Sequence, residues 1–273
     1  MHPLSLIISA FMTVATTAAP ITPGSFSSLP YFILAGDSTT ATQSSNGGGW
    51  GDGFLNTTLF NGASGVNKGH NGATTISFRQ QGFWQGVLSE IQQVQEKKQQ
   101  YIPYVTIQFG HNDQKIKSLT LDQYQSNLET FAQEVKYAGG IPILVTPLSR
   151  RNYEKDNSND DGREVIKEDL AEQREATIRA AIASQTVYID LNAASEKYLN
   201  AIGPEKAWTY NLIATNDHTH LNDHGSQVFG GLVAELMLEN PSLAAPLGVR
   251  GYVRVDEELK RALRDGKYFW PSS

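Results

Sequence analysis

The sequence predicts an α/β protein, a three-layer α/β/α sandwich with a mainly parallel sheet. Short apolar runs rich in β-branched residues alternate along the chain with amphipathic helical patterns. Near-continuous apolar strands of this kind are typical of parallel sheets that helices cover on both faces. Right-handed crossovers between such strands distribute the helices over the two faces. The chain has 273 residues, of which 40% are hydrophobic, and this suffices for one large globular domain.

Apolar runs and helical spacing predict the individual elements in chain order. We predict strands at residues 31–35, 104–109, 141–146 and 187–191, and a further short strand around residues 66–68. Apolar residues at helical spacing predict helices at residues 84–98, 121–137, 164–183 and 223–238. A long polar loop is expected at residues 150–162. The single domain is expected to span residues 20–273, with a core at residues 30–238 and a C-terminal extension at residues 240–273.

The N-terminus predicts a secreted, extracellular protein. Residues 1–19 resemble a signal peptide, because an apolar core at residues 4–15 precedes small residues suited to cleavage. A disordered or membrane-anchoring N-terminus is the alternative, although the apolar run is short for a membrane span. Asn56 begins an Asn-Thr-Thr glycosylation sequon, which agrees with secretion as a glycoprotein.

Charge and composition exclude several classes of function. The net charge is -6 and no run of basic residues occurs, which argues against nucleic-acid binding. The chain has no cysteine, so a thiol nucleophile, a thiolate metal site and disulfides are excluded. We expect no membrane partner and a monomer.

Polar motifs follow the ends of three predicted strands. Residues 36–38 (Gly-Asp-Ser) follow the first strand, residues 110–113 (Gly-His-Asn-Asp) a second, and residues 146–149 (Thr-Pro-Leu-Ser) a third. Parallel α/β sheets bind their ligands at the carboxyl ends of the strands. The sequence therefore predicts that these distant segments meet at one edge of the sheet.

Ser38 is the candidate nucleophile, and a helix N-cap is its ordinary alternative role. Asp217 and His220 are three residues apart, ahead of a predicted helix, so the carboxylate can orient the imidazole toward a distant serine. His218 and His224 compete with His220 as the base. Only His220 has the aspartate three residues before it with no helix turn between them.

Two further residues are candidate donors to a developing oxyanion. Gly72, in a polar turn, could supply a backbone N–H group, and Asn112 a side-chain amide. The N–H group of Ser38 itself would complete the oxyanion hole. Glycine and asparagine are also ordinary turn residues, which is the alternative for each.

Two segments carry metal-binding alternatives. The acidic and histidine residues at 217–224 could form a zinc site, although no glutamate adjoins His220 to act as a base. Residues 157–168 resemble a calcium loop whose first position is Asn157 instead of aspartate. A solvated polar loop is the simpler interpretation of both, and we expect neither a metal nor a cofactor.

These four ordered blocks, with Ser38, Gly72, Asn112 and the pair Asp217 and His220, resemble those of the SGNH (GDSL-type) hydrolases. Within that family the chain is similar to rhamnogalacturonan acetylesterases over roughly residues 30–238. The resemblance implies an SGNH or flavodoxin-like fold and a catalytic triad of Ser38, Asp217 and His220. It also implies an oxyanion hole of Ser38, Gly72 and Asn112.

The implied function is a carbohydrate acetylesterase acting on acetylated plant cell-wall polysaccharide, with acetylated rhamnogalacturonan (pectin) as first choice. Arg150 and Arg151 would then bind uronic-acid carboxylates, or else remain solvated. The second block, residues 67–75, lacks the Gly-Arg-Ser run usual in these esterases. Acetylxylan or another hemicellulose, a lipase or short-chain esterase, and an inactive carbohydrate-binding protein are therefore kept as alternatives.

Overall fold

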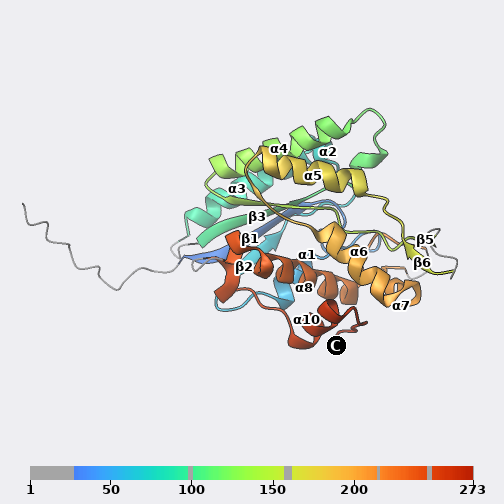
Figure 1. Cartoon of the computed structure of the whole chain (residues 1–273). Helices are drawn as coiled ribbons and strands as arrows, with labels where there is room; N and C mark the ends of the chain where they lie inside the picture. Colours follow the sequence, from blue (N-terminus) through green and yellow to red (C-terminus); the bar gives the residue numbers. More distant parts are fainter. Residues whose placement is uncertain (1–27, 98–100, 157–161, 214–215, 245–247, 273) are drawn as a thin grey trace, which may run out of the picture.

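A five-stranded parallel sheet forms the centre of the protein (Figure 1). The computed structural model describes residues 28–97, 101–156, 162–213, 216–244 and 248–272. Every neighbouring pair of strands in this sheet is parallel. In spatial order the strands are β2 (Ser64–Asn67), β1 (Leu29–Gly36), β3 (Tyr101–Gln108), β4 (Ile141–Val145) and β7 (Val187–Ile189). All five predicted strands are present, and the predicted fold class is confirmed.

Helices cover both faces of this sheet, as Figure 1 shows. One face carries α2 (Thr75–Gln80), α3 (Phe83–Gln95), α4 (Leu121–Tyr137) and α5 (Ala171–Ala183). The opposite face carries α1 (Gly51–Thr57), α6 (Leu191–Ile202) and α8 (Asp223–Glu239). Successive residues of β1 enter the two cores, since Phe32 packs in the layer of α1 and α8 and Ile33 in the layer of α3 and α4.

One predicted helix starts later than expected. The helical pattern covers residues 164–183, but residues Glu164–Ile166 form strand β6, and α5 begins only at Ala171. Strand β6 pairs antiparallel with β5 (Tyr153–Lys155), which interrupts the predicted loop of residues 150–162. The last residue of β6 is buried in the core, so tertiary contacts hold this segment extended against its local pattern.

The helices α1, α2 and α6 were not predicted, and the structure adds several further short elements. These are the 3₁₀ turns η1 (Asp113–Lys115) and η2 (Val249–Gly251), and the helices α7 (Pro204–Trp208), α9 (Pro241–Ala244) and α10 (Glu257–Asp265). The C-terminal segment is held by two contacts. Leu259 of α10 joins the core beneath α8, and the Tyr210 hydroxyl donates to the carbonyl of Phe269. This segment therefore packs on the body that carries the sheet.

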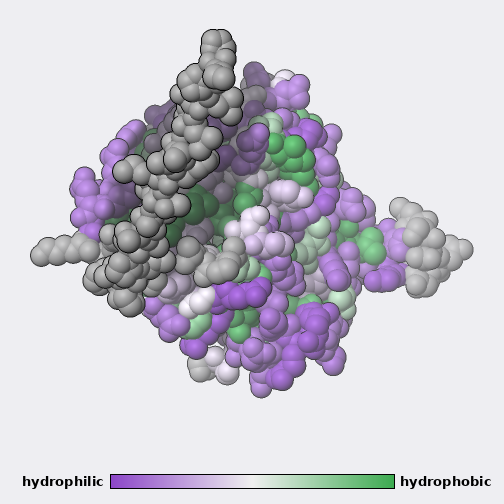
Figure 2. All heavy atoms as spheres, turned by 60° about the vertical axis from the view of Figure 1, so that its left-hand side comes forward, coloured by the Kyte–Doolittle hydropathy of each residue, from purple (hydrophilic) through white to green (hydrophobic). Residues whose placement is uncertain are grey.

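One face of the molecule is mainly hydrophilic (Figure 2). On the face in Figure 2, hydrophilic side chains predominate, and hydrophobic ones form small separate patches. In the described part of the chain, no helix has both the length and the hydrophobicity needed to cross a bilayer. The predicted signal at residues 1–19 lies outside the described residues, so secretion stays a prediction. Asn56, the predicted glycosylation site, is exposed on α1.

Two glycines let α1 and α8 approach closely. A Cβ atom added to Gly53 would lie 1.9 Å from the carbonyl oxygen of Ser226, and one added to Gly230 would lie 2.3 Å from the backbone nitrogen of Phe54. The N–H group of Gly53 also donates to Ser226 Oγ at 3.0 Å. This contact fixes the start of α8, which directly follows the segment that carries His220.

We expect Gly230→Ala to lower the free energy of unfolding by about 1–3 kcal/mol, because the added methyl group must push α1 and α8 apart. The matched control is Gly86→Ala in α3, where a Cβ atom would meet no atom within 4 Å. That variant should be stabilised by about 0.5–1 kcal/mol, since alanine favours the helix. Urea unfolding measures both, and equal stability of the two variants would contradict this account of the helix contact.

Candidate active site

The first strand leads into a tight turn that presents Ser38. At Gly36 a Cβ atom would lie 2.4 Å from Thr40 Oγ1, so the close approach of the turn requires glycine. The carboxylate of Asp37 accepts hydrogen bonds from the N–H and hydroxyl groups of Thr39 at 2.9 and 2.8 Å. These contacts brace the turn, and Ser38 lines an open cavity at the carboxyl edge of the sheet.

Ser38, His220 and Asp217 meet at this edge. His220 Nε2 lies 2.8 Å from Ser38 Oγ, and His220 Nδ1 lies 2.7 Å from Asp217 Oδ2. Asp217 Oδ1 accepts hydrogen bonds from the backbone N–H groups of Thr219 and His220, both at 2.9 Å. Burial favours a higher pKa for Asp217, but these N–H donors and the His220 ring together lower it. The ionised carboxylate therefore holds the Nδ1 proton and leaves Nε2 to accept the proton of Ser38.

The two competing histidines lie elsewhere. His218 Nδ1 is 2.8 Å from the carbonyl oxygen of Arg151, and its ring meets Trp208 edge-on. His224 stacks on Trp270 with 4.0 Å between ring centroids. Of the three histidines that the sequence leaves open, only His220 is hydrogen-bonded to Ser38.

The candidate oxyanion donors gather beside the nucleophile. Ser38, Gly72 and Asn112 all line the same cavity. Within the described ranges, the backbone N–H groups of Ser38 and Gly72 have no hydrogen-bond acceptor. Asn112 Nδ2 donates one proton to the carbonyl of Ala73 at 3.1 Å, which orients the amide and leaves its second proton for another acceptor. The arrangement can hold an oxyanion at the carbon that Ser38 would attack.

The cavity is broad, and most of the residues that line it are polar. Its volume is about 570 Å³. Besides the groups above, amide and hydroxyl side chains line it, namely Ser45, Asn46, Asn71, Asn216 and Thr219. Ile213 contributes an apolar wall. Of the lysines and arginines in the described residues, Lys115 is the one that lines the cavity. Lys115 Nζ donates to Asn112 Oδ1 at 3.1 Å, so it lies next to the candidate oxyanion hole.

The chain is similar to a known family over the stretch that contains these site residues. A profile of the GDSL-like Lipase/Acylhydrolase family matches residues 34–228, which include Ser38, Gly72, Asn112, Asp217 and His220. The chain belongs to this family. The resemblance to SGNH (GDSL-type) hydrolases that its motifs predict is therefore confirmed.

Two relatives of the chain come from Bacillus subtilis (strain 168). The chain is 29% identical over 214 residues to the probable rhamnogalacturonan acetylesterase YesY, a match that covers 75% of this chain and 91% of YesY. It is 31% identical over 221 residues to the rhamnogalacturonan acetylesterase RhgT, covering 74% of this chain and 87% of RhgT. These identities establish a distant homology with the rhamnogalacturonan acetylesterases.

Solved structures share the GDSL-type fold. The protein YXIM from Bacillus subtilis superposes with a TM-score of 0.63 at 22% identity, covering 80% of this chain, which spans 58% of YXIM. Axe2, an acetylxylan esterase from Geobacillus stearothermophilus, superposes with a TM-score of 0.52 at 22% identity, covering 78% of this chain and 94% of Axe2. At these identities the likeness concerns the fold.

The predicted role of Arg150 and Arg151 in binding substrate does not agree with their positions in the structure. Neither Arg150 nor Arg151 lines the cavity. Arg151 is fully buried, with 0% of its surface exposed, and donates within the protein. Arg150 is partly buried and donates to Thr219 Oγ1 and to the carbonyl of His111. A pair of basic residues in a polar stretch favours a solvated ligand site, whereas here Arg151 is enclosed by the protein and Arg150 is hydrogen-bonded to its neighbours.

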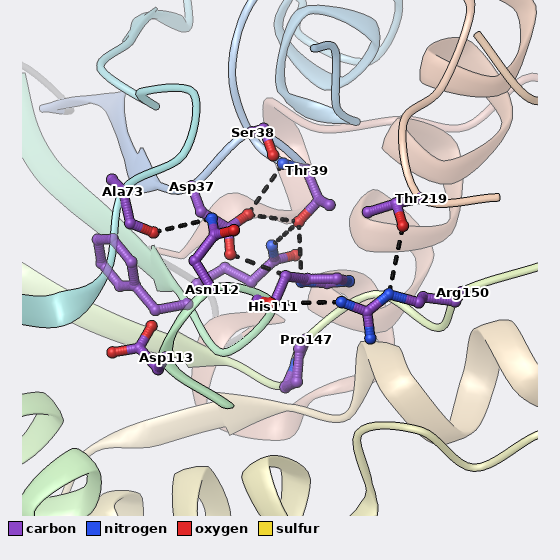
Figure 3. A network of polar contacts seen from close by, with 12 residues as sticks. Asp37, Ser38, Thr39, Ala73, His111, Asn112, Asp113, Pro147, Arg150 and Thr219 are labelled. Atoms are coloured by element: carbon purple, nitrogen blue, oxygen red, sulfur yellow. Dashed lines mark hydrogen bonds and ion pairs between the residues drawn. The ribbon is translucent and has the colours of Figure 1, made fainter. Parts of the chain in front are cut away.

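A buried polar network joins the Ser38 turn to the Asn112 turn (Figure 3). His111 Nδ1 lies 3.5 Å from both Asp37 Oδ2 and Thr39 Oγ1. The Gln108 amide donates to the same Thr39 hydroxyl and accepts from Trp50 Nε1 at 2.8 Å. Burial lowers the pKa of His111, which favours its neutral form. Asp37 and His111 belong to two of the predicted motifs, but the sequence gives no sign that their side chains meet, because the two motifs are far apart in the chain.

The two metal-binding alternatives have different outcomes. Among the described residues, no group of three or more His, Asp or Glu side chains is arranged to hold a metal ion. Residues 157–161 of the calcium-like loop lie outside the described residues. The expectation that the protein needs neither metal nor cofactor stays a prediction.

Asp113 is a buried acid whose protonation should make stability depend on pH. Its Oδ1 accepts from the N–H and hydroxyl groups of Thr75 at 2.8 and 2.6 Å. Burial raises the pKa of Asp113 to about 6, above the value of about 3.9 expected in the unfolded chain. Between these values the folded protein binds the proton more tightly than the unfolded chain. The stability that this proton contributes is complete below about pH 4 and is lost as the pH rises through about 6.

We expect the free energy of unfolding of the wild type, relative to that of Asp113→Asn, to fall by up to about 3 kcal/mol between pH 4 and pH 6. Urea unfolding at several pH values within and above this window measures the difference. Asp122→Asn, which removes an exposed acid at the start of α4, is the control for the loss of one acidic side chain. Parallel stability curves for the wild type and Asp113→Asn would contradict the raised pKa.

Proposed function

We propose that the chain is a secreted serine esterase that removes acetyl groups from plant cell-wall polysaccharide, with acetylated rhamnogalacturonan as first candidate. The contact of His220 with Ser38 at 2.8 Å and with Asp217 at 2.7 Å carries this proposal. An oriented imidazole in contact with a serine hydroxyl is the arrangement that activates an oxygen nucleophile. Homology with two rhamnogalacturonan acetylesterases supports the substrate class.

In the first step, Ser38 Oγ attacks the acetyl carbonyl carbon while its proton passes to His220 Nε2. The negative charge of Asp217 stabilises the imidazolium that forms. The carbonyl oxygen becomes an oxyanion, which the N–H groups of Ser38 and Gly72 and the Asn112 amide receive. When the tetrahedral intermediate collapses, His220 gives the proton to the departing sugar oxygen, and the acetyl group remains on Ser38.

In the second step, water enters the open cavity and His220 takes a proton from it. The hydroxide that forms attacks the acetyl-serine carbonyl, and the same donors stabilise the second oxyanion. The bond from the carbonyl carbon to Ser38 Oγ then breaks, the proton on His220 returns to Ser38 Oγ, and acetic acid leaves and ionises to acetate in solution. The proposed chemistry uses no cofactor.

The lining of the cavity favours a carbohydrate over a lipid. A sugar presents many hydroxyl groups, and the asparagine and serine side chains around the cavity can pair with them. A long acyl chain needs an apolar channel, and Ile213 alone among the residues named at the cavity offers such a surface. Lys115 supplies the positive charge, expected at first from the two arginines, that would meet a uronic-acid carboxylate.

We expect Ser38→Ala to lose hydrolysis of p-nitrophenyl acetate by about 10⁴–10⁶-fold, because it removes the attacking atom. His220→Ala should lose nearly as much. Ser126→Ala, an exposed serine on α4, is the control and should keep full activity. Circular dichroism checks that each variant is folded. A folded Ser38→Ala with most of its activity would mean that another residue attacks the ester.

We expect acetate release from acetylated polysaccharides and a preference for short acyl chains. The assay compares acetate released from acetylated rhamnogalacturonan and acetylated xylan with hydrolysis of p-nitrophenyl esters of increasing chain length. Rhamnogalacturonan should be the best polymer, because its uronic acids can meet Lys115. A rate that peaks at octanoate, with no acetate from either polymer, would identify a lipid esterase instead. Binding of polymer without any turnover would identify an inactive carbohydrate-binding protein.

A further inference from the structure

The two arginines that do not line the cavity lie against the short segment that carries the base, residues 218–220. The backbone N–H of Arg151 donates to the carbonyl of His218 at 2.8 Å. In return, the carbonyl of Arg151 lies 2.8 Å from His218 Nδ1 and accepts from Trp208 Nε1 at 3.1 Å. The backbone of Arg151 therefore holds both the main chain and the side chain of His218.

The guanidinium of Arg151 reaches the base itself. Its Nη2 donates to the carbonyl oxygen of His220 at 2.9 Å, and its Nε donates to Asn211 Oδ1. Burial lowers the pKa of Arg151 to about 10, which still leaves the group charged at neutral pH, and the nearby Asp217 carboxylate supports that charge. The buried guanidinium thus holds the backbone of His220, while the Asp217 carboxylate holds its ring.

Arg150 links the same segment to the oxyanion side. Its Nε donates to Thr219 Oγ1 at 3.2 Å, and its Nη2 donates to the carbonyl of His111 at 3.3 Å (Figure 3). The side-chain amide of Gln114 is oriented by its hydrogen bonds, and in this orientation its oxygen also accepts from the Arg150 guanidinium. His111 directly precedes Asn112, so one guanidinium spans from the base segment to the oxyanion turn.

We propose that Arg150 and Arg151 are positioning residues that hold residues 218–220 in register with Ser38 and Asn112. The proposal rests on the serine-esterase function proposed above. Residues 216–220 belong to no helix or strand, so regular backbone hydrogen bonding does not fix them. A guanidinium offers several donors in a rigid fork, which suits it to fixing carbonyl and hydroxyl oxygens. A displacement of about 1 Å in a catalytic group can cost about 10²-fold in rate.

The test uses Arg150, because it is only partly buried and its loss should leave the sheet intact. Arg150→Ala should lower kcat for p-nitrophenyl acetate by about 10–100-fold and leave KM close to that of the wild type, since the side chain does not line the cavity. Guanidinium at a non-denaturing concentration should restore part of this loss, and Arg150→Lys should retain part of kcat.

The matched control is Arg174→Ala. Arg174 is also partly exposed and is held by a two-pronged ion pair, with its Nη2 at 2.6 Å from Asp190 Oδ2, but it touches no residue of the base segment. It should lose stability and keep its kcat. Thr219→Val removes the acceptor of Arg150 Nε, so the effect of Arg150→Ala should be smaller in that background than in the wild type.

A second measurement does not depend on turnover. The proton shared by His220 Nδ1 and Asp217 should give a far-downfield proton NMR resonance in the wild type, and it should broaden or shift in Arg150→Ala but not in Arg174→Ala. A folded Arg150→Ala with unchanged kcat and an unchanged resonance would overturn the proposal, as would a rise in KM alone, which would indicate a substrate contact. A wild type without esterase activity would refute the proposed function, while the resonance would still report on the positioning role.

Discussion

The Asp217 carboxylate determines both the shape of the base segment and the protonation of its histidine. One oxygen accepts the N–H groups of Thr219 and His220, so the backbone folds around it. The other oxygen meets His220 Nδ1 and fixes which ring nitrogen carries the proton. Because these contacts lower the pKa of Asp217, the carboxylate stays charged at any pH well above that lowered value. The remaining parts of the site only have to bring a serine and oxyanion donors to this ring.

The order of the strands brings those parts together. β2, β1, β3 and β4 are neighbours in this order, and all run in the same direction. The segments that follow them carry Gly72, Ser38, Asn112 and the arginine pair, so these groups lie in a row at one edge. The register pairs Gly36 with Gln108, which sets the Ser38 turn beside the turn that leads to Asn112. His220 lies in the segment just ahead of α8, in the layer that α8 forms with α1. The close contact at Gly53 and Gly230 fixes the position of α8.

The strands, and the residues that meet in the candidate site, could be predicted because their signals are local. An apolar run that ends in a polar motif marks the carboxyl end of a buried strand, and an aspartate three residues before a histidine marks a loop pair. The residues that misled the prediction depend on distant partners. Residues 164–166 match a helical pattern, yet pairing with residues 153–155 holds them extended. Arg151 sits in a polar stretch, and nothing near it in sequence shows that residues 218–220 will enclose it.

Enclosing a guanidinium is costly, and the structure shows what offsets that cost. A buried charge needs hydrogen bonds and a counter-charge: Arg151 donates to Asn211 Oδ1 and to the carbonyl of His220, and the Asp217 carboxylate supports its charge, while Nη1 has no hydrogen-bond partner among the described residues. Apolar side chains of similar size would fill the same space without this cost, but apolar packing has no direction and would leave the His220 carbonyl with only the backbone N–H group of Leu212 as a donor. In a helix or a strand, backbone N–H groups would pair such carbonyls. In the irregular segment that carries His220, the backbone and side chain of Arg151 take over part of this task, and this explains why a base held by a loop can still be aimed at Ser38.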